Sequence, residues 1–243
     1  MTLYERMKEN YEYPYNFRLT KRTPVIIRID GKAFRTFTKH FGKPFDPILT
    51  HAMQLTMLEL CKNIQGATFG YTQSDEISIL LQDYENLETS AWFDYEVQKL
   101  CSVSASMATL YFNKFFKELV AMHSVEGEKH HEARLKAAFE GALFDARCFN
   151  LPKEEVANYF ISRQSDAIRN SIQMVGQAYF THKELNRKSL EDIKKMLKEK
   201  NIDWAEYSTS KKRGTACYKA EEWDIDYTTP LFTEDREYIE KYV

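Results

Sequence analysis

At 243 residues, the chain is long enough to bury one substantial hydrophobic core. Hydrophobic residues make up 43% of it and charged residues 29%, a balance that excludes an intrinsically disordered protein. The net charge of −2 argues neither for nor against a nucleic-acid partner. No apolar run approaches the roughly 18 residues that a membrane span needs, so we expect no membrane association. We expect one domain over residues 1–243.

The cysteines and the first residues bear on the cellular compartment. The four cysteines are widely spaced and form no CxxC pair, which favours free thiols in the reducing cytoplasm. The first residues lack the basic and apolar regions of a secretory signal. His123, His130 and His131 fall in a polar stretch without metal-ligand spacing, so we expect an exposed loop over 121–135.

In the first half of the chain, the pattern predicts the core of the fold. An irregular, aromatic lead-in covers 1–23, and the core follows over 24–150. Buried strands are expected where short apolar runs lie between Gly, Pro and polar turn residues. Helices are expected where apolar residues recur every three to four positions. The predicted elements are a strand over 25–30, a helix over 47–64, strands over 67–72 and 77–81 joined by the turn 73–76, a long helix over 95–119, and a strand over 146–150.

The second half, 151–243, is predicted to be mainly helical. A long helix is expected over 153–180, and a shorter one over 189–200. Ser189 is a plausible N-cap for the shorter helix, with Asp192 three residues later as in a capping box. A last strand is expected over 215–219.

The order strand–helix–strand–strand–helix–strand is typical of ferredoxin-like and palm domains. We therefore predict an α+β fold with a palm or ferredoxin-like antiparallel sheet, helices on one face, and added C-terminal helices. In this topology the first and third strands are neighbours. Asp30 ends the first strand and Asp75 begins the third, so the fold should bring them together. Two such carboxylates can share divalent metal ions, as in enzymes that transfer phosphoryl groups.

An ordered set of motifs resembles the tRNA-histidine guanylyltransferase superfamily, whose members polymerise in the 3′-to-5′ direction. No single motif is specific, but the set keeps the family order across about 24–219. The matching stretches are Arg28-Ile29-Asp30-Gly31 with Phe34, Lys43-Pro44, Tyr71-Thr72-Gln73-Ser74-Asp75-Glu76, Phe144-Asp145-Ala146-Arg147, Arg163-Gln164-Ser165-Asp166 and Arg213-Gly214-Thr215.

One departure separates this chain from the eukaryotic members of the family. They carry His-Ile-Asn-Asn after the Arg-Gln-x-Asp stretch, whereas here Ile168 stands in place of the histidine. The chain thus resembles the guanylyltransferase-like branch of bacteria and archaea. That resemblance implies template-dependent addition of nucleotides to the 5′ end of truncated tRNA. Addition of G to tRNA-histidine remains open, and the chemistry itself is unaffected.

The resemblance implies two Mg²⁺ ions, with ATP, GTP and other nucleoside triphosphates as substrates. The metal ions would be held by Asp30, Asp75 and the backbone carbonyl of Gly31. Glu76 is a further catalytic candidate, as an outer ligand of the metal ions. The alternative is that it is only the solvent-exposed start of a strand. The nucleotide-binding candidates are Asp30, Gly31, Lys32, Ala33, Phe34, Arg35, Lys43, Ser74, Asp75, Lys99 and Arg147.

The expected macromolecular partner is tRNA. Between Lys183 and Arg213 there are ten Lys or Arg against six Asp or Glu, which suits a phosphate backbone or simply a solvated helix face. The tRNA-binding candidates are Arg163, Asn170, Lys211, Lys212 and Arg213. The resemblance also implies a homotetramer. Two alternatives stay open from the sequence: a palm-type nucleotide cyclase and a non-catalytic tRNA-binding protein.

Overall fold

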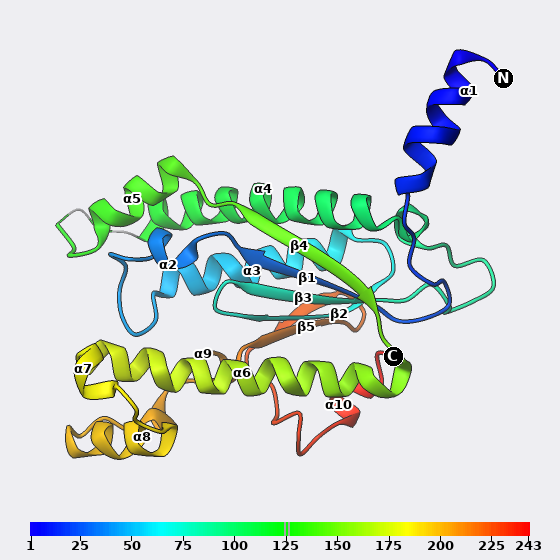
Figure 1. Ribbon diagram of the computed structural model, residues 1–243. Helices are drawn as coiled ribbons and strands as arrows, with labels where there is room; N and C mark the ends of the chain where they lie inside the picture. Colours follow the sequence, from blue (N-terminus) through cyan, green and yellow to red (C-terminus); the bar gives the residue numbers. More distant parts are fainter. Residues whose placement is uncertain (124, 126) are drawn as a thin grey trace.

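The computed structural model describes residues 1–123, 125 and 127–243, and Figure 1 shows a central sheet between helical layers. The strands are β1 (Val25–Gly31), β2 (Ala67–Gln73), β3 (Glu76–Leu81), β4 (Phe144–Asn150), β5 (Thr215–Lys219) and β6 (Trp223–Asp226). The α-helices are α1 (Leu3–Met7), α2 (Phe34–Phe37), α3 (Pro47–Asn63), α4 (Val97–His123), α5 (His131–Glu140), α6 (Lys153–Tyr179), α7 (His182–Leu185), α8 (Leu190–Glu199), α9 (Thr209–Arg213) and α10 (Glu237–Glu240). In the described part of the chain, none of the helices combines the length and apolarity needed to cross a membrane.

The sheet has the strand order β4-β1-β3-β2-β5-β6, and every neighbouring pair is antiparallel. Since β1 and β2 both run antiparallel to β3, they are parallel to each other, as a crossover through α3 requires. The inner order β4-β1-β3-β2 is that of a palm or ferredoxin-like domain. The α+β fold class predicted from the sequence is therefore confirmed.

Alternation along β1 divides the core into two layers. Val25, Ile27 and Ile29 face a cluster formed with α3 and α4. Ile26 and Leu80 face the other way, into a cluster formed with α6 and α10. Helices therefore cover both faces of the sheet (Figure 1), because α6, one of the predicted C-terminal helices, packs on the face opposite α3 and α4.

The ends of the chain differ most from the expectations. The lead-in over 1–23 is helical rather than irregular up to Tyr15, with π-helical and 3-10 turns after α1. Thr2 caps its start in a capping box, and Figure 1 shows this arm projecting away from the sheet. At the other end, β6 pairs with β5, which is therefore not the last strand. The predicted N-cap at Ser189 is confirmed, because its side chain accepts from the Asp192 amide.

The expected loop over 121–135 is largely helical in the described residues. His123 is the last residue of α4, and His131 is the first of α5. The ring of His130 bonds to the carbonyl oxygen of His40 at 2.8 Å. Residues 124 and 126 lie outside the described part of the chain. This stretch thus joins α4 to a helix that packs against it.

The four cysteines are free, as expected, but they lie in two close pairs. The Sγ atoms of Cys61 and Cys217 are 3.3 Å apart in the core, between α3 and β5. Gly70 of β2 lies against both: a Cβ there would be 2.5 Å from one sulfur and 2.8 Å from the other. The glycine is required by this close approach of helix and sheet.

We predict that Gly70→Ala lowers the free energy of unfolding by about 1–3 kcal/mol, because the added methyl group overpacks the core. Urea denaturation followed by circular dichroism measures this loss. Lys219→Ala, at the exposed end of β5, serves as the control and should leave stability nearly unchanged. Wild-type stability in Gly70→Ala would contradict the packing described here.

Candidate active site

Asp30, Asp75 and Glu76 meet at one end of the sheet. The register of β1 and β3 pairs Asp30 with Glu76. One residue further, the Gly31 amide donates to the carbonyl oxygen of Asp75 at 3.1 Å. Between β2 and β3 the chain reverses in a two-residue turn, which Ser74 enters with a left-handed φ of 52°. The structure therefore brings the two predicted metal ligands together, through backbone pairing.

The strand on the other side of β1 adds a fourth acid. Asp145 of β4 pairs with Asp30 in register. Asp145 belongs to one of the matching motifs, but it is not among the site residues predicted from the sequence. Its position follows from the β1–β4 register, which the sequence does not reveal locally.

The surroundings disfavour the negative charge of these carboxylates. Burial is the main cause that raises the pKa of Asp30, and the charge of Asp145 adds to it. Burial likewise raises the pKa of Asp75, with a smaller contribution from Asp30. The pKa of Glu76 is raised by burial too, although Arg163 and Arg28 act in the opposite direction. A bound cation would relieve this unfavourable environment.

Arginines partly offset the acidic charge. Nη1 of Arg163 donates to Glu76 Oε2 at 3.2 Å, and its Nη2 donates to Asp166 at 2.6 Å. The other Glu76 oxygen, Oε1, is buried without a hydrogen-bond partner, as is Nε of the neighbouring Arg28. Arg163, a tRNA-binding candidate from the sequence, thus lies against the catalytic candidates.

The donor set fits Mg²⁺. Asp30 and Asp75 provide hard oxygen ligands, and the buried Oε1 of Glu76 is one more acceptor beside them. Among the described residues, no group of three or more His, Cys, Asp or Glu forms a ready metal site. Mg²⁺ commonly takes one or two carboxylates and completes its shell with phosphate oxygens and water. These residues thus suit an ion that arrives with a nucleotide.

The first two amide groups after Asp30 are already hydrogen-bonded within the protein. Besides the Gly31 amide, that of Lys32 is engaged, donating to Leu143 at 2.8 Å. Ala33 has a left-handed φ of 56° and leads into α2. The amides at the start of α2 remain for a phosphate group. The Phe34 ring packs in the core, with its centroid 5.1 Å from the ring centroid of Phe37.

A cavity of about 390 Å³ opens beside the carboxylate of Asp75, which is part of its lining. It collects five of the predicted nucleotide-binding residues, namely Phe34, Arg35, Lys43, Ser74 and Asp75. A smaller cavity of about 80 Å³ shares Asp46, Leu49, Ser74 and Met174 with it.

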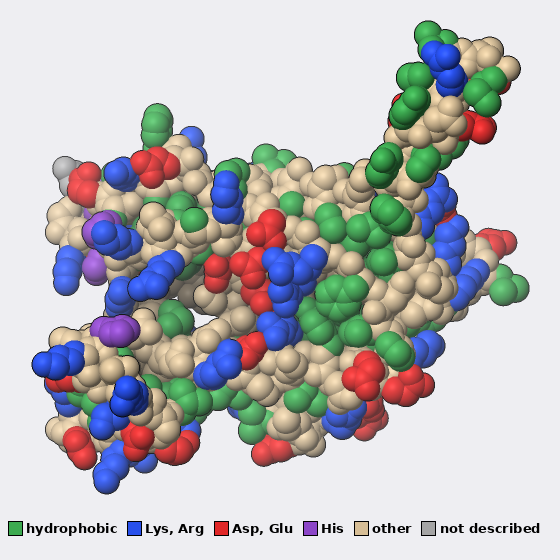
Figure 2. Space-filling view, viewed as in Figure 1, with side chains coloured by type: hydrophobic (Ala, Val, Ile, Leu, Met, Phe, Trp, Pro, Cys, Tyr) green, Lys and Arg blue, Asp and Glu red, His purple; other side chains and the backbone are tan. Residues whose placement is uncertain are grey.

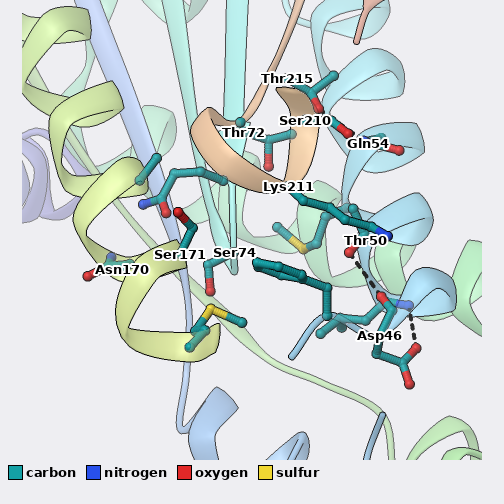
Figure 3. Close-up of a pocket in the computed structure, with 17 residues that line it drawn as sticks. Asp46, Thr50, Gln54, Thr72, Ser74, Asn170, Ser171, Ser210, Lys211 and Thr215 are labelled. Atoms are coloured by element: carbon teal, nitrogen blue, oxygen red, sulfur yellow. Dashed lines mark hydrogen bonds between the residues drawn. The ribbon is translucent and has the colours of Figure 1, made fainter. Parts of the chain in front are cut away.

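The smaller cavity lies between α3 and α6, and Figure 3 shows hydroxyl and amide side chains around it. Its polar lining includes Thr50, Gln54, Thr72, Asn170, Ser171, Ser210, Lys211 and Thr215. Asn170 and Lys211, predicted to bind tRNA, therefore line a cavity next to the turn at Ser74. On the surface, Figure 2 shows Lys and Arg side chains on both sides of the hollow between the α5 end and the α7–α8 end of the molecule.

Four other predicted residues lie elsewhere or are already engaged. Lys99 is exposed and forms an ion pair with Glu96 at 3.3 Å. Lys99 lies in the turn of α4 that contacts Cys148 of β4. Cys148 pairs with Ile27 of β1, which is three residues before Asp30. At roughly 3.3 Å per residue, this separates Lys99 from the carboxylates by about 10 Å along the strand.

Arg147 lies at the margin of the site, where it bonds Asp145 at 2.9 Å. Lys212 donates to the Ala205 carbonyl at 2.6 Å. The carbonyl of Arg213 accepts from the Tyr71 hydroxyl at 2.6 Å, and the Arg213 Nε is buried without a partner. Of the basic residues after α8, Lys211 alone combines an exposed position with a place in a cavity lining.

The chain is similar to tRNA(His) guanylyltransferases and related proteins. A family model described as tRNAHis guanylyltransferase matches residues 4–152. The solved structure of a bacterial tRNA(His) guanylyltransferase-like protein in complex with ATP is 44% identical, covers 100% of this chain and 99% of that chain, and has a TM-score of 0.89. One in complex with GTP is 40% identical, with the same coverage and a TM-score of 0.79. A probable tRNA(His) guanylyltransferase of Dictyostelium discoideum is 29% identical over 169 residues, 67% of this chain and 59% of the relative.

We predict that Mg²⁺ raises the thermal stability of the protein, because the ion binds the folded carboxylate pair and not the unfolded chain. The gain should be about 2.7 kcal/mol at roughly 100 times the dissociation constant. In Asp75→Asn the gain should be lost, while stability in metal-free buffer should match or exceed that of the wild type, since repulsion from Asp30 is removed. Differential scanning calorimetry with and without Mg²⁺ measures both effects. Equal Mg²⁺ stabilisation of the variant would place the ion elsewhere.

Proposed function

Because the chain belongs to the tRNAHis guanylyltransferase family, a family of nucleotidyltransferases, we propose that it is a template-dependent 3′-to-5′ nucleotidyltransferase. Its proposed role is to add nucleotides to the 5′ end of truncated tRNA in the cytoplasm. The observation that carries the proposal is the meeting of Asp30 and Asp75 beside a cavity of about 390 Å³. Carboxylates at a strand end next to such a cavity suit the transfer of a nucleotide.

The proposed reaction consists of two phosphoryl transfers. First, an oxygen of the tRNA 5′-monophosphate attacks the α-phosphorus of ATP, and pyrophosphate leaves. Then the 3′-hydroxyl of the incoming nucleoside triphosphate attacks the activated 5′-phosphorus, and AMP leaves. A 5′-triphosphate end needs no adenylylation and releases pyrophosphate in the second step. Catalysis of this kind is mostly positioning and neutralisation of charge.

The residues of the chain have distinct proposed tasks. Asp30, Asp75 and the carbonyl of Gly31 would hold Mg²⁺, which when bound would lower the pKa of the attacking hydroxyl and neutralise phosphate oxygens. Lys43 and Arg35 line the larger cavity and neutralise the triphosphate. Hydroxyl and amide groups of the smaller cavity orient the nucleotide that extends past Ser74. ATP and GTP are the expected nucleotides, because each is bound by a similar protein.

Ile168 supports repair over dedicated addition of G to tRNA-histidine. It packs with Phe45 and Tyr207 against a small apolar cluster that contains Ile172 and Val175 of α6. An aliphatic side chain in this cluster offers no hydrogen bond to a particular base. Choice of the added nucleotide therefore falls to the opposing base of the tRNA. Addition of G to tRNA-histidine remains compatible with the same chemistry.

For the tRNA contact, we propose Lys211 together with the lysines of α8. Lys195 and Lys198 are exposed on this helix, and Asn170 lies nearby in the lining of the smaller cavity with Lys211. Exposed lysines suit a phosphate backbone because they bind it without regard to sequence. The family resemblance further supports a homotetramer as the functional assembly.

A matched pair of lysines tests the nucleotide site. We predict that Lys43→Ala raises the KM for ATP about tenfold while tRNA affinity stays near wild type, because Lys43 lines the cavity and loses one phosphate contact. Lys99→Ala should leave the KM for ATP unchanged, because Lys99 pairs with Glu96 away from the cavity. Steady-state kinetics at saturating tRNA give the KM for ATP of each variant, and a titration with tRNA gives its affinity. Equal effects of the two substitutions would contradict the assigned site.

The proposed activity is tested with a 5′-monophosphorylated tRNA that lacks its first nucleotide, supplied with Mg²⁺, ATP and the four nucleoside triphosphates. We expect extension by one nucleotide complementary to the opposing base, and more than 100-fold slower extension by Asp75→Asn, since losing even an outer-sphere partner costs about 10–100-fold. Substituting the opposing base should switch the nucleotide added. Incorporation that ignores the opposing base would contradict templated addition. A cyclic product from GTP alone would instead indicate a nucleotide cyclase.

A further inference from the structure

One wall of the larger cavity is a segment without regular secondary structure. Residues 38–46 connect α2 to α3, and seven of them line the cavity: Thr38, Lys39, Phe41, Gly42, Lys43, Pro44 and Asp46. Such a segment needs tertiary contacts to keep one shape, because its backbone has few partners of its own. The position of Lys43 relative to Asp75 depends on those contacts.

The side chain of Asp46 accepts three backbone hydrogen bonds where this segment meets α3. Its Oδ1 accepts from the amides of Ile48 and Leu49 at 3.1 Å each, which caps α3. Its Oδ2 accepts from the amide of Gly42 at 3.1 Å, which closes the segment on itself. One carboxylate thus joins the start of the helix to the cavity wall.

Arg134 of α5 binds this carboxylate. Its Nε and Nη2 lie 3.0 and 2.9 Å from Asp46 Oδ2. Its Nη1 lies 2.8 Å from both carboxylate oxygens of Glu128. The side chains of Arg134 and Asp46 are only 5% and 2% exposed, so this ion pair is shielded from water. His130 adds a second link through the carbonyl of His40.

The geometry points to Arg134 as a positioning residue for nucleotide binding: by orienting Asp46, it holds the segment 38–46 so that Lys43 faces the cavity. Arg134 does not line either cavity, and it acts only through Asp46. The inference rests on the proposed function, whose nucleotide occupies this cavity. Sequence reasoning placed Arg134 at the end of an exposed loop, because its partner lies 88 residues away.

Lysine cannot replace this arginine fully. A guanidinium group reaches two carboxylates at once with a planar fork of donors, whereas an ammonium group has a single nitrogen. In Arg134→Lys the buried charge is kept, so the fold should survive. One of the two carboxylates loses its partner, and the Gly42–Asp46 bond loosens. A displacement of about 1 Å at a binding group can cost on the order of 100-fold in rate or affinity.

Hydrogen exchange of the wild type, Arg134→Lys and the control Lys136→Met tests the positioning step without any substrate. Lys136 lies on the same helix, but it is exposed, and its Nζ forms an ion pair with Glu140 Oε1 at 3.7 Å. We expect faster exchange over 38–46 in Arg134→Lys, unchanged exchange in the strands, and no change in the control. Unchanged exchange over 38–46 would overturn the inference.

Calorimetric titration with ATP and Mg²⁺, together with addition kinetics, tests the functional step. We expect Arg134→Lys to raise the dissociation constant and the KM for ATP about tenfold or more, with kcat within about twofold of wild type. Wild-type ATP affinity in the variant, or a loss confined to kcat, would overturn the inference. Wild-type protein that binds ATP but adds no nucleotide would refute the proposed reaction and leave the affinity comparison valid.

Discussion

The antiparallel pairing of β1 with β3 is the constraint on which the site depends. It places Asp30 opposite Glu76, and it ends in the bond from the Gly31 amide to Asp75. A slip of one residue would turn Asp30 into the layer of α3 and α4 and bring Ile29 to the opposite face. The apolar residues that fix the register therefore also determine the direction in which the carboxylates point. Packing of the core and chemistry at the sheet end are two results of one pairing.

Concentrating acids at this sheet end has a cost that the fold offsets only in part. Burial raises the pKa values of Asp30 and Asp75, and repulsion from Asp145 and from Asp30, respectively, adds to it, while Arg163 stabilises the neighbouring Glu76. We therefore expect the site to bind a cation together with a polyanionic substrate more tightly than it binds either one alone. On the other side of the cavity, the Asp46–Arg134 pair is fully enclosed and satisfied. One wall of the proposed nucleotide site is thus fixed by an ion pair. The other wall carries negative charge that a bound cation would neutralise.

Sequence reasoning found the elements whose signals are local. The bounds of β1, α3, α6 and α8 were predicted within a residue or two, because apolar spacing and caps reveal them. It missed the features that arise from contacts distant in sequence. The helical arm over 3–15 has no buried face in the described chain, so periodicity did not mark it. Asp46 stands directly before Pro47, a local signal for a helix start that reasoning about motifs overlooked. Its bond to Arg134, in contrast, depends on how α5 packs.

The central claim is that Asp30 and Asp75 together hold the metal ions of the reaction. The most direct measurement is a crystal structure of the protein with Mn²⁺ and a non-hydrolysable ATP analogue, with the ions located by anomalous scattering. The account predicts anomalous peaks between the two carboxylates and the triphosphate, with the nucleotide in the cavity beside Lys43. An ordered nucleotide whose metal ions lie away from Asp30 and Asp75 would contradict it.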